Sequence, residues 1–155
     1  MIRDCGLSGP SNFRDLGGYA AADGRTVRWR RIFRSDALRL TDTDVAILRD
    51  EVGLRLVIDL RTAFEYGRRE GGGNENYVQR NAAVGAHRVH LPMVDETRIK
   101  RQASDERPIA ARSYLKMFER GGPALTEAFA YIADPAHHPL VFHCAAGKDR
   151  TGILA

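Results

Sequence analysis

The stretch LVFHCAAGKDRTG, residues 140 to 152, decides the fold prediction. Its first four residues form a short apolar run that is typical of a buried strand. Small residues follow Cys144, and a helix is expected to begin near Thr151. In α/β domains, a loop between a strand and a helix lies at the carboxyl end of the sheet, where ligands bind. The sequence therefore predicts a functional site at Cys144.

Alternating helix and strand patterns upstream complete the prediction of one α/β domain, residues 1–155, with a partly parallel sheet flanked by helices. Capping boxes mark two helix starts, and turn residues mark the ends of elements. The expected elements are a hairpin near 19–34, a helix from Thr41 to Gly53, a strand at 54–60, a helix capped by Thr62 and Glu65, a strand in VHLPM ended by Pro92, and helices at 111–120 and 123–133.

The composition is that of a globular domain. The chain has 155 residues, of which 43% are hydrophobic and 28% charged, and this is enough to bury a core. No apolar run is long enough to span a bilayer, and the first residues lack the apolar core of a signal peptide. We therefore expect a soluble and by default cytoplasmic protein, although export without a signal peptide is compatible with the sequence.

The two cysteines, Cys5 and Cys144, are too few for a disulfide scaffold, and neither has the spacing of a zinc site. We expect reduced thiols, with no metal and no cofactor.

The chain is basic, with a formal net charge of +4, and all but three of its 24 basic residues are arginines. Arginine suits phosphate groups, but basicity alone indicates an anionic partner only weakly. No helix-turn-helix, zinc or RNA-recognition pattern is present, so nucleic acid is not predicted as a partner.

The loop after the last strand has the composition of an anion-binding site. Ala145, Ala146 and Gly147 leave room for backbone amides to surround an anion, and the following helix adds positive potential. The same field stabilises the thiolate of Cys144. Arg150 can close the site with two hydrogen bonds to phosphoryl oxygens, so that Cys144 can attack phosphorus.

Neighbouring residues have supporting roles in this interpretation. Thr151 can hydrogen-bond the leaving thiolate when a phosphocysteine is hydrolysed. His143 is expected to orient the loop and favour the thiolate, the alternative being a histidine with only a structural role. Lys148 favours multiply anionic substrates, unless it pairs with a nearby carboxylate.

The spacing of Cys144 and Arg150, with His143 before and Thr151-Gly152 after, resembles the signature of the cysteine-dependent protein tyrosine phosphatases. HCAAGKDRTG, together with NFRDLGGY (12–19), IFRSDAL (32–38) and VIDLRTAFE (57–65), resembles one branch, the bacterial family typified by mycobacterial protein tyrosine phosphatase B. The resemblance covers nearly the whole chain.

This resemblance implies a phosphatase-like fold and hydrolysis of phosphotyrosine, and also of phosphoserine, phosphothreonine or phosphoinositide monoesters, through a phosphocysteine intermediate. It implies that Cys144 is the nucleophile, that Arg150 clamps the phosphate, and that Lys148 and Asp149 suit acidic or inositol phosphate substrates. The expected partners are phosphorylated proteins or phospholipid headgroups.

Three aspartates are candidates for the general acid that protonates a tyrosyl leaving group. Asp59 ends a predicted strand and matches an aspartate proposed for this role in the resembled family, the alternative being helix capping or pairing with Arg61. Asp149 lies in the loop itself, and Asp95 begins the charged, weakly periodic residues 94–109, which we interpret as a lid or mobile excursion.

Other interpretations of the loop fit less well. A nucleotide-binding P-loop requires Gly at 142 and Ser or Thr at 149, where this chain has Phe142 and Asp149. A rhodanese-like sulfurtransferase also carries a loop cysteine, but Arg150 and Thr151 are in phosphatase register. A catalytically silent phosphate-binding module stays open, and so does a purely structural, buried Cys144.

Two further expectations concern the ends of the chain. We interpret NFRDLGGY as mainly structural, in a position to buttress the site. The chain ends at Ala155, whereas members of the resembled family continue, so we expect a domain truncated after the phosphate-binding loop. An uncovered apolar surface on that side would favour self-association.

Overall fold

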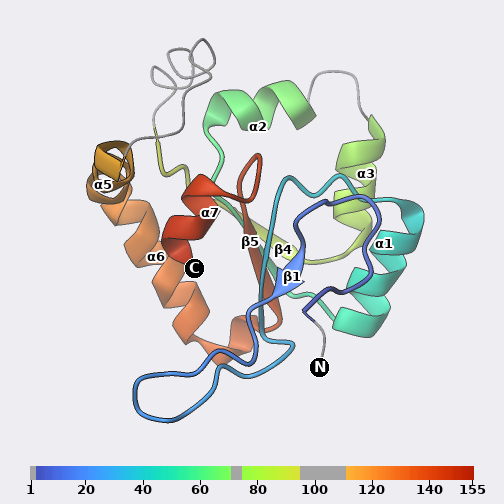
Figure 1. The fold of residues 1–155 in the computed structure, drawn as a ribbon. Coiled ribbons are helices and arrows are strands. Elements are labelled where there is room, and N and C mark those ends of the chain that lie inside the picture. The colour runs from blue at the N-terminus through green and yellow to red at the C-terminus, as the bar shows by residue number, and fades with distance from the viewer. Residues whose placement is uncertain (1–2, 71–74, 95–110) are drawn as a thin grey trace.

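The computed structural model describes residues 3–70, 75–94 and 111–155, and it has a five-stranded sheet with helices on both faces (Figure 1). The sheet order is β1-β2-β5-β3-β4, in which only the β1–β2 pair is antiparallel. The strands are β1 (Arg14–Asp15), β2 (Ile32–Ser35), β3 (Leu56–Asp59), β4 (His87–His90) and β5 (Leu140–His143). The predicted α/β fold with a partly parallel sheet is confirmed.

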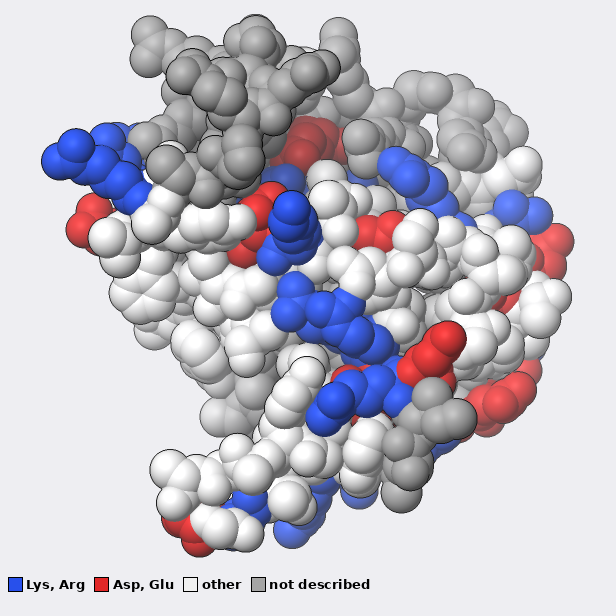
Figure 2. Space-filling view, viewed as in Figure 1, with Lys and Arg blue, Asp and Glu red and all other residues white. Residues whose placement is uncertain are grey.

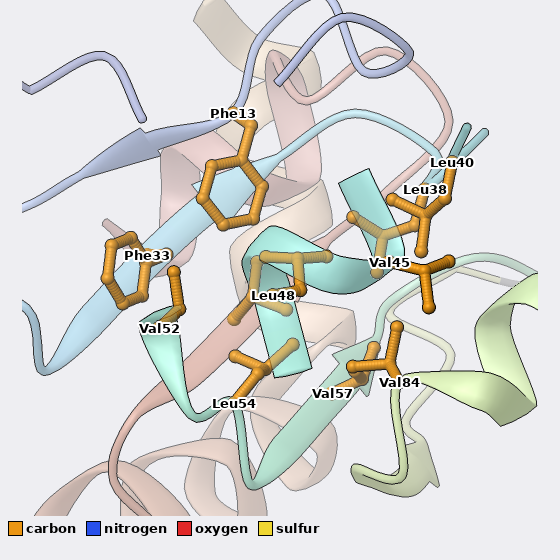
Figure 3. Packing of buried hydrophobic residues seen from close by; sticks show 11 residues of the cluster. Phe13, Phe33, Leu38, Leu40, Val45, Leu48, Val52, Leu54, Val57 and Val84 are labelled. Carbon is orange, nitrogen blue, oxygen red and sulfur yellow. The ribbon is translucent and has the colours of Figure 1, made fainter. Parts of the chain in front are cut away.

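One face of the sheet packs against helix α1 (Asp42–Ala46), its π-helical continuation η1 (Ile47–Val52), and the region of α3 (Glu75–Ala83). Alternation along the strands sends every second side chain to this face. Figure 3 shows how the side chains interlock there. The buried residues of this cluster are Phe13, Phe33, Leu38, Leu40, Val45, Leu48, Val52, Leu54, Val57, Val84 and Val141.

The opposite face packs against α6 (Gly122–Ala133) and α7 (Asp149–Leu154), with α5 (Ala111–Arg120) beside them, on the left in Figure 1. Helix α2 (Ala63–Glu70) follows β3 directly and lies at the top of Figure 1, past the carboxyl ends of the strands. A short 3-10 helix, η2 (Pro135–His137), leads from α6 into β5. The phosphate-binding loop expected after β5 therefore lies between α2 and α7.

The start of α1 follows from its sequence. Thr41 accepts a hydrogen bond from the Asp44 amide and Asp44 accepts one from the Thr41 amide, which is the predicted capping box. The helical segment ends at Gly53, whose φ of 67° is left-handed. The predicted second cap is also present, since Thr62 and Glu65 exchange the same pair of hydrogen bonds at the start of α2.

Several boundaries differ from those predicted. The hairpin near 19–34 is a tight turn with one isolated bridge, Ala20 to Thr26, and β2 begins only at Ile32. Strand β4 is HRVH and not VHLPM, because its pairing with β3 begins at His87. Helix α3 was not predicted, because it begins at Glu75, inside the glycine-rich EGGGNEN stretch at 70–76, whose composition is typical of a loop. Residues 71–74 of this stretch lie outside the described residues. The candidate lid at 94–109 lies outside them too, except for its first residue.

A groove of about 480 Å³ runs beside the end of α7. Its walls are mostly apolar. They are formed by Leu16, Tyr19, Val27, Ile32, Arg34, Phe129, Ile132, Phe142, Gly152, Leu154 and Ala155. Self-association through this surface stays a prediction.

Candidate active site

The predicted strand-loop-helix unit is present at the carboxyl end of β5. Cys144 follows the strand directly and is 2% exposed, and α7 begins at Asp149. Gly147 has a φ of 65°, and a Cβ atom there would lie 2.6 Å from the backbone of Ser35 and of Asp36. Glycine is required at this position both by its left-handed backbone and by the close approach of the loop to β2.

Arg150 lies in the first turn of α7 and forms a two-fold ion pair with Glu65 of α2. Its Nη1 and Nη2 donate to the two carboxylate oxygens over 2.5 and 2.9 Å. Burial works against the charged guanidinium, but the hydrogen bonds and charge of Glu65 outweigh it and raise the pKa of Arg150. The guanidinium also donates through Nη1 to the carbonyl oxygen of Leu60 over 3.5 Å, so three of its five N–H groups have partners and two are left for a phosphoryl group.

The charge of Cys144 acts on Arg150 as well, since it is a further cause of the raised pKa of that arginine. Thr151 is fully buried, and its hydroxyl has no hydrogen-bond partner in the described part of the chain. A hydroxyl without another partner is available to donate a hydrogen bond to the Cys144 thiolate. This role of Thr151 stays a prediction.

Asp59 ends β3 beneath the loop, where it pairs with Arg61. Both side chains are almost completely buried, and Arg61 Nη2 lies 2.5 Å from the Asp59 carboxylate. Burial alone would raise the pKa of Asp59, but the electrostatic interaction with the neighbouring His143 and the ion pair with Arg61 outweigh it and hold the pKa well below its usual range. This low pKa favours the ionised carboxylate, and the pair with Arg61 corresponds to the arginine-pairing alternative; the role of Asp59 in catalysis stays a prediction.

Asp149 is partly buried within the loop region and accepts a hydrogen bond of 2.5 Å from the Tyr114 hydroxyl of α5. This hydrogen bond is the main cause of a raised pKa of Tyr114. The third candidate acid, Asp95, lies outside the described residues. Of the two aspartates that can be compared, Asp149 is the accessible one.

His143 is completely buried and contacts both the loop and Asp59. Its Nδ1 lies 3.2 Å from the carbonyl oxygen of Cys144, and its Nε2 lies 3.4 Å from the Asp59 carboxylate. Burial lowers the pKa of His143 to about 4, against the opposing charge of Asp59. A neutral, buried imidazole suits the predicted orienting role and not proton transfer.

The remaining predicted residues line the loop. Ala145 is partly buried and Ala146 is exposed. Lys148 is exposed, and within the described ranges its side chain forms no ion pair. Basic side chains form a band across the middle of the face seen in Figure 2.

Sequence reasoning missed two residues that hold the site together. Glu65 was predicted only as a helix cap, because its partner Arg150 lies 85 positions away along the chain. Asn12 donates through its side-chain amide to the carbonyl oxygens of Ala146 and Gly147. The sequence signal that could have identified Asn12 was its position in NFRDLGGY, the segment that we interpreted as a structural support of the site.

The described residues contain no group of histidine, cysteine, aspartate and glutamate side chains that could hold a metal ion. None of their helices has the length and apolar character needed to cross a bilayer.

Comparison with known proteins identifies the family. A model of the tyrosine phosphatase family matches residues 5–155, so the chain belongs to that family. A Cupriavidus necator protein assigned to the tyrosine-protein phosphatases is 33% identical over 147 residues, which cover 94% of this chain and 52% of that protein. The triple specificity protein phosphatase PtpB of Mycobacterium tuberculosis is 32% identical over 181 residues, which cover 96% of this chain and 60% of PtpB.

These findings confirm the resemblance noted in the motifs. The chain spans little more than half of the length of both relatives. A crystal structure of the core catalytic domain of the PP-IP phosphatase SIW14 from S. cerevisiae, in complex with citrate, matches with a TM-score of 0.52 at 18% identity, over 96% of this chain and 64% of that one. This structural similarity confirms the phosphatase-like fold.

Proposed function

We propose that the protein is a cysteine-dependent phosphatase that hydrolyses phosphate monoesters, phosphotyrosine among them, through a phosphocysteine intermediate. The observation that carries the proposal is that Cys144 begins the loop after β5 and Arg150 lies in the first turn of the helix that follows it, with the Arg150 guanidinium held by Glu65. Membership of the tyrosine phosphatase family supports the same chemistry.

The first step is attack by the Cys144 thiolate on phosphorus. The sulfur–phosphorus bond forms as the ester phosphorus–oxygen bond breaks, and the leaving oxygen takes a proton from a general acid. Arg150 and the loop amides stabilise the charge on the transferring phosphoryl oxygens. Water then attacks phosphorus and gives a proton to the carboxylate of the general acid, the sulfur–phosphorus bond breaks, and Thr151 stabilises the departing thiolate by a hydrogen bond.

We assign the general acid to Asp149. Its carboxyl group is partly accessible and belongs to the first residue of α7, next to Arg150, whereas Asp59 is buried and paired with Arg61. The Tyr114 hydroxyl donates to the same carboxyl group and fixes its orientation.

Multiply anionic substrates, such as phosphoinositide headgroups, are proposed in addition to phosphotyrosine. The exposed Lys148 would attract additional phosphate groups. The band of basic side chains on the face seen in Figure 2 would add to this attraction. The name of the relative PtpB, a triple specificity phosphatase, is consistent with more than one kind of substrate.

Phosphate release from a phosphotyrosine peptide and from a panel of phosphoinositides tests the proposal. The protein should release phosphate, and Cys144→Ser should abolish release while retaining the substrate as a bound ligand. If the unchanged protein only binds phosphopeptide, as tightly as Cys144→Ser does, the phosphate-binding module is correct instead. Transfer of sulfur from thiosulfate to cyanide would indicate the rhodanese-like alternative.

A further inference from the structure

The outer edge of the phosphate-binding loop is held by side chains from the N-terminal part of the protein. The side-chain amide of Asn12 donates to the carbonyl oxygens of Ala146 and Gly147, over 3.3 and 3.0 Å. Arg34 of β2 donates through Nη2 to the same Gly147 oxygen over 2.9 Å. Two consecutive carbonyl groups of the loop are therefore bound from outside by side chains more than 100 positions away in the sequence.

The orientation of the Asn12 amide is fixed by a second arginine. Arg14 donates through Nη1 to Asn12 Oδ1, and an arginine side chain has no acceptor. The amide oxygen of Asn12 must therefore face Arg14, and its NH₂ group must face the loop. The backbone is held too, since the Asp36 carboxylate accepts hydrogen bonds from the amides of Ser11 and Asn12 over 3.3 and 3.2 Å.

Holding these carbonyl groups determines where the loop amides point. A trans peptide unit is planar, so its C=O and the following N–H point in opposite directions. With the carbonyl groups of Ala146 and Gly147 bound on the outer side, the amides of Gly147 and Lys148 are directed to the inner side. Ala145 is held in the same way, because its carbonyl oxygen accepts a hydrogen bond from the Ala37 amide over 3.2 Å.

We propose that Asn12 is a positioning residue of the active site, which, together with Arg34, directs the loop amides toward the phosphoryl oxygens. Preorganised amides of this kind need no reorientation when the anion binds. The inference rests on the proposed function, since it concerns affinity for a phosphoryl group. In this proposal, Asn12 of the NFRDLGGY segment orients the phosphate-binding loop in addition to packing against it.

The test measures anion binding at Cys144 and does not depend on turnover. Iodoacetamide, a neutral reagent, alkylates the thiolate, and inorganic phosphate or vanadate should protect it. Mass spectrometry separates alkylation of Cys144 from that of Cys5, whose pKa is raised by burial to about 11. The concentration of anion that halves the alkylation rate reports its affinity, and the pH profile of the rate reports the thiolate.

Asn12→Ala removes both side-chain donors and should weaken protection by about five- to thirtyfold, the loss expected for one or two hydrogen bonds to an anion-binding loop. Asn12→Asp has nearly the same shape but turns an acceptor toward two carbonyl oxygens, so it should weaken protection further. Both should also shift the alkylation profile of Cys144 to higher pH. Asn76→Ala, on the exposed side of α3, is the matched control and should change neither property.

Arg34→Lys is a second variant, which keeps the positive charge but lacks the Nη2 group that donates to the carbonyl oxygen of Gly147. It should weaken protection in the same direction, and it keeps the test decisive if the Asn12 variants do not fold. Undiminished protection in Asn12→Ala, or in Arg34→Lys if only that variant folds, would overturn the inference while leaving the proposed function intact. Absence of protection in the unchanged protein would overturn the proposed function, and the inference with it.

Discussion

Glu65 and Arg150 form a two-fold hydrogen-bonded ion pair that joins α2 to the helix after the phosphate-binding loop. The Glu65 side chain is 13% exposed and that of Arg150 is 11% exposed, so water screens the pair only partly. One Glu65 oxygen also accepts a hydrogen bond from the Thr62 amide. The same carboxylate thus caps a helix and holds the arginine that we assign to phosphate binding.

Substitution of Glu65 should therefore impair the site more than the fold. In Glu65→Gln the charge that holds Arg150 is lost, and we expect kcat/KM to fall about 10- to 100-fold, the scale of effect of a misplaced catalytic group. Steady-state kinetics on a phosphotyrosine peptide would measure it. Glu119→Gln, exposed on α5, is the control, and an equal loss in both variants would contradict the assigned role of Glu65.

A second prediction separates the two aspartates. Asp149→Asn should lower turnover of phosphotyrosine more than turnover of an ester whose leaving group has a low pKa, because only the first needs protonation. The ratio of the two kcat values measures this difference. Asp59→Asn should instead remove the negative charge that pairs with the buried Arg61, and so lower the free energy of unfolding by about 3–5 kcal/mol.

The opposite result would reverse the assignment. If Asp59→Asn folds with unchanged stability and loses activity selectively on phosphotyrosine, then Asp59 is the general acid. Urea unfolding beside the kinetic assay distinguishes these outcomes.

The sequence predicted those parts of the site that depend on local pattern. LVFH followed by small residues was enough to place Cys144 at the end of a buried strand, and the spacing to Arg150 was enough for the phosphatase resemblance. Thr62 and Glu65 were recognised as a cap because both hydrogen bonds lie within one turn of helix.

The contacts missed from the sequence depend on how distant segments meet. The sequence left Asp59 open between a general acid and a partner of Arg61, and only the structure shows that the two side chains pair within a buried site. In the same way, Asn12 reaches Gly147 only because β2 lies next to β5. Such pairings follow from sheet order and register, which a single sequence does not reveal.

A third prediction concerns pH and His143. Its pKa in the folded protein is about 4, below the value of about 6.5 expected in the unfolded chain, so the unfolded state binds the proton first as pH falls. Stability is therefore full above about pH 6.5 and is lost as pH falls toward 4, by up to about 3 kcal/mol. Aspartate and glutamate side chains contribute mainly below this range, so the upper part of it reports His143.

Urea unfolding at several pH values between 7 and 4.5 measures this loss. His143→Gln should be less stable at pH 7 and should show a flatter pH dependence. A slope that is unchanged in His143→Gln would mean that the pH dependence arises elsewhere.

The last prediction concerns the glycine of the loop. Gly147→Ala combines a left-handed backbone with a Cβ atom 2.6 Å from the backbone of Ser35 and Asp36, so the loop must move away from β2. Gly24→Ala is the matched control, because Gly24 has a φ of 80° and open space around it, and the change there should cost only about 1–2 kcal/mol of stability. Gly147→Ala should abolish protection of Cys144 by vanadate, whereas Gly24→Ala should preserve it. Loss of protection in both variants would show that general destabilisation, and not displacement of the loop from β2, is responsible.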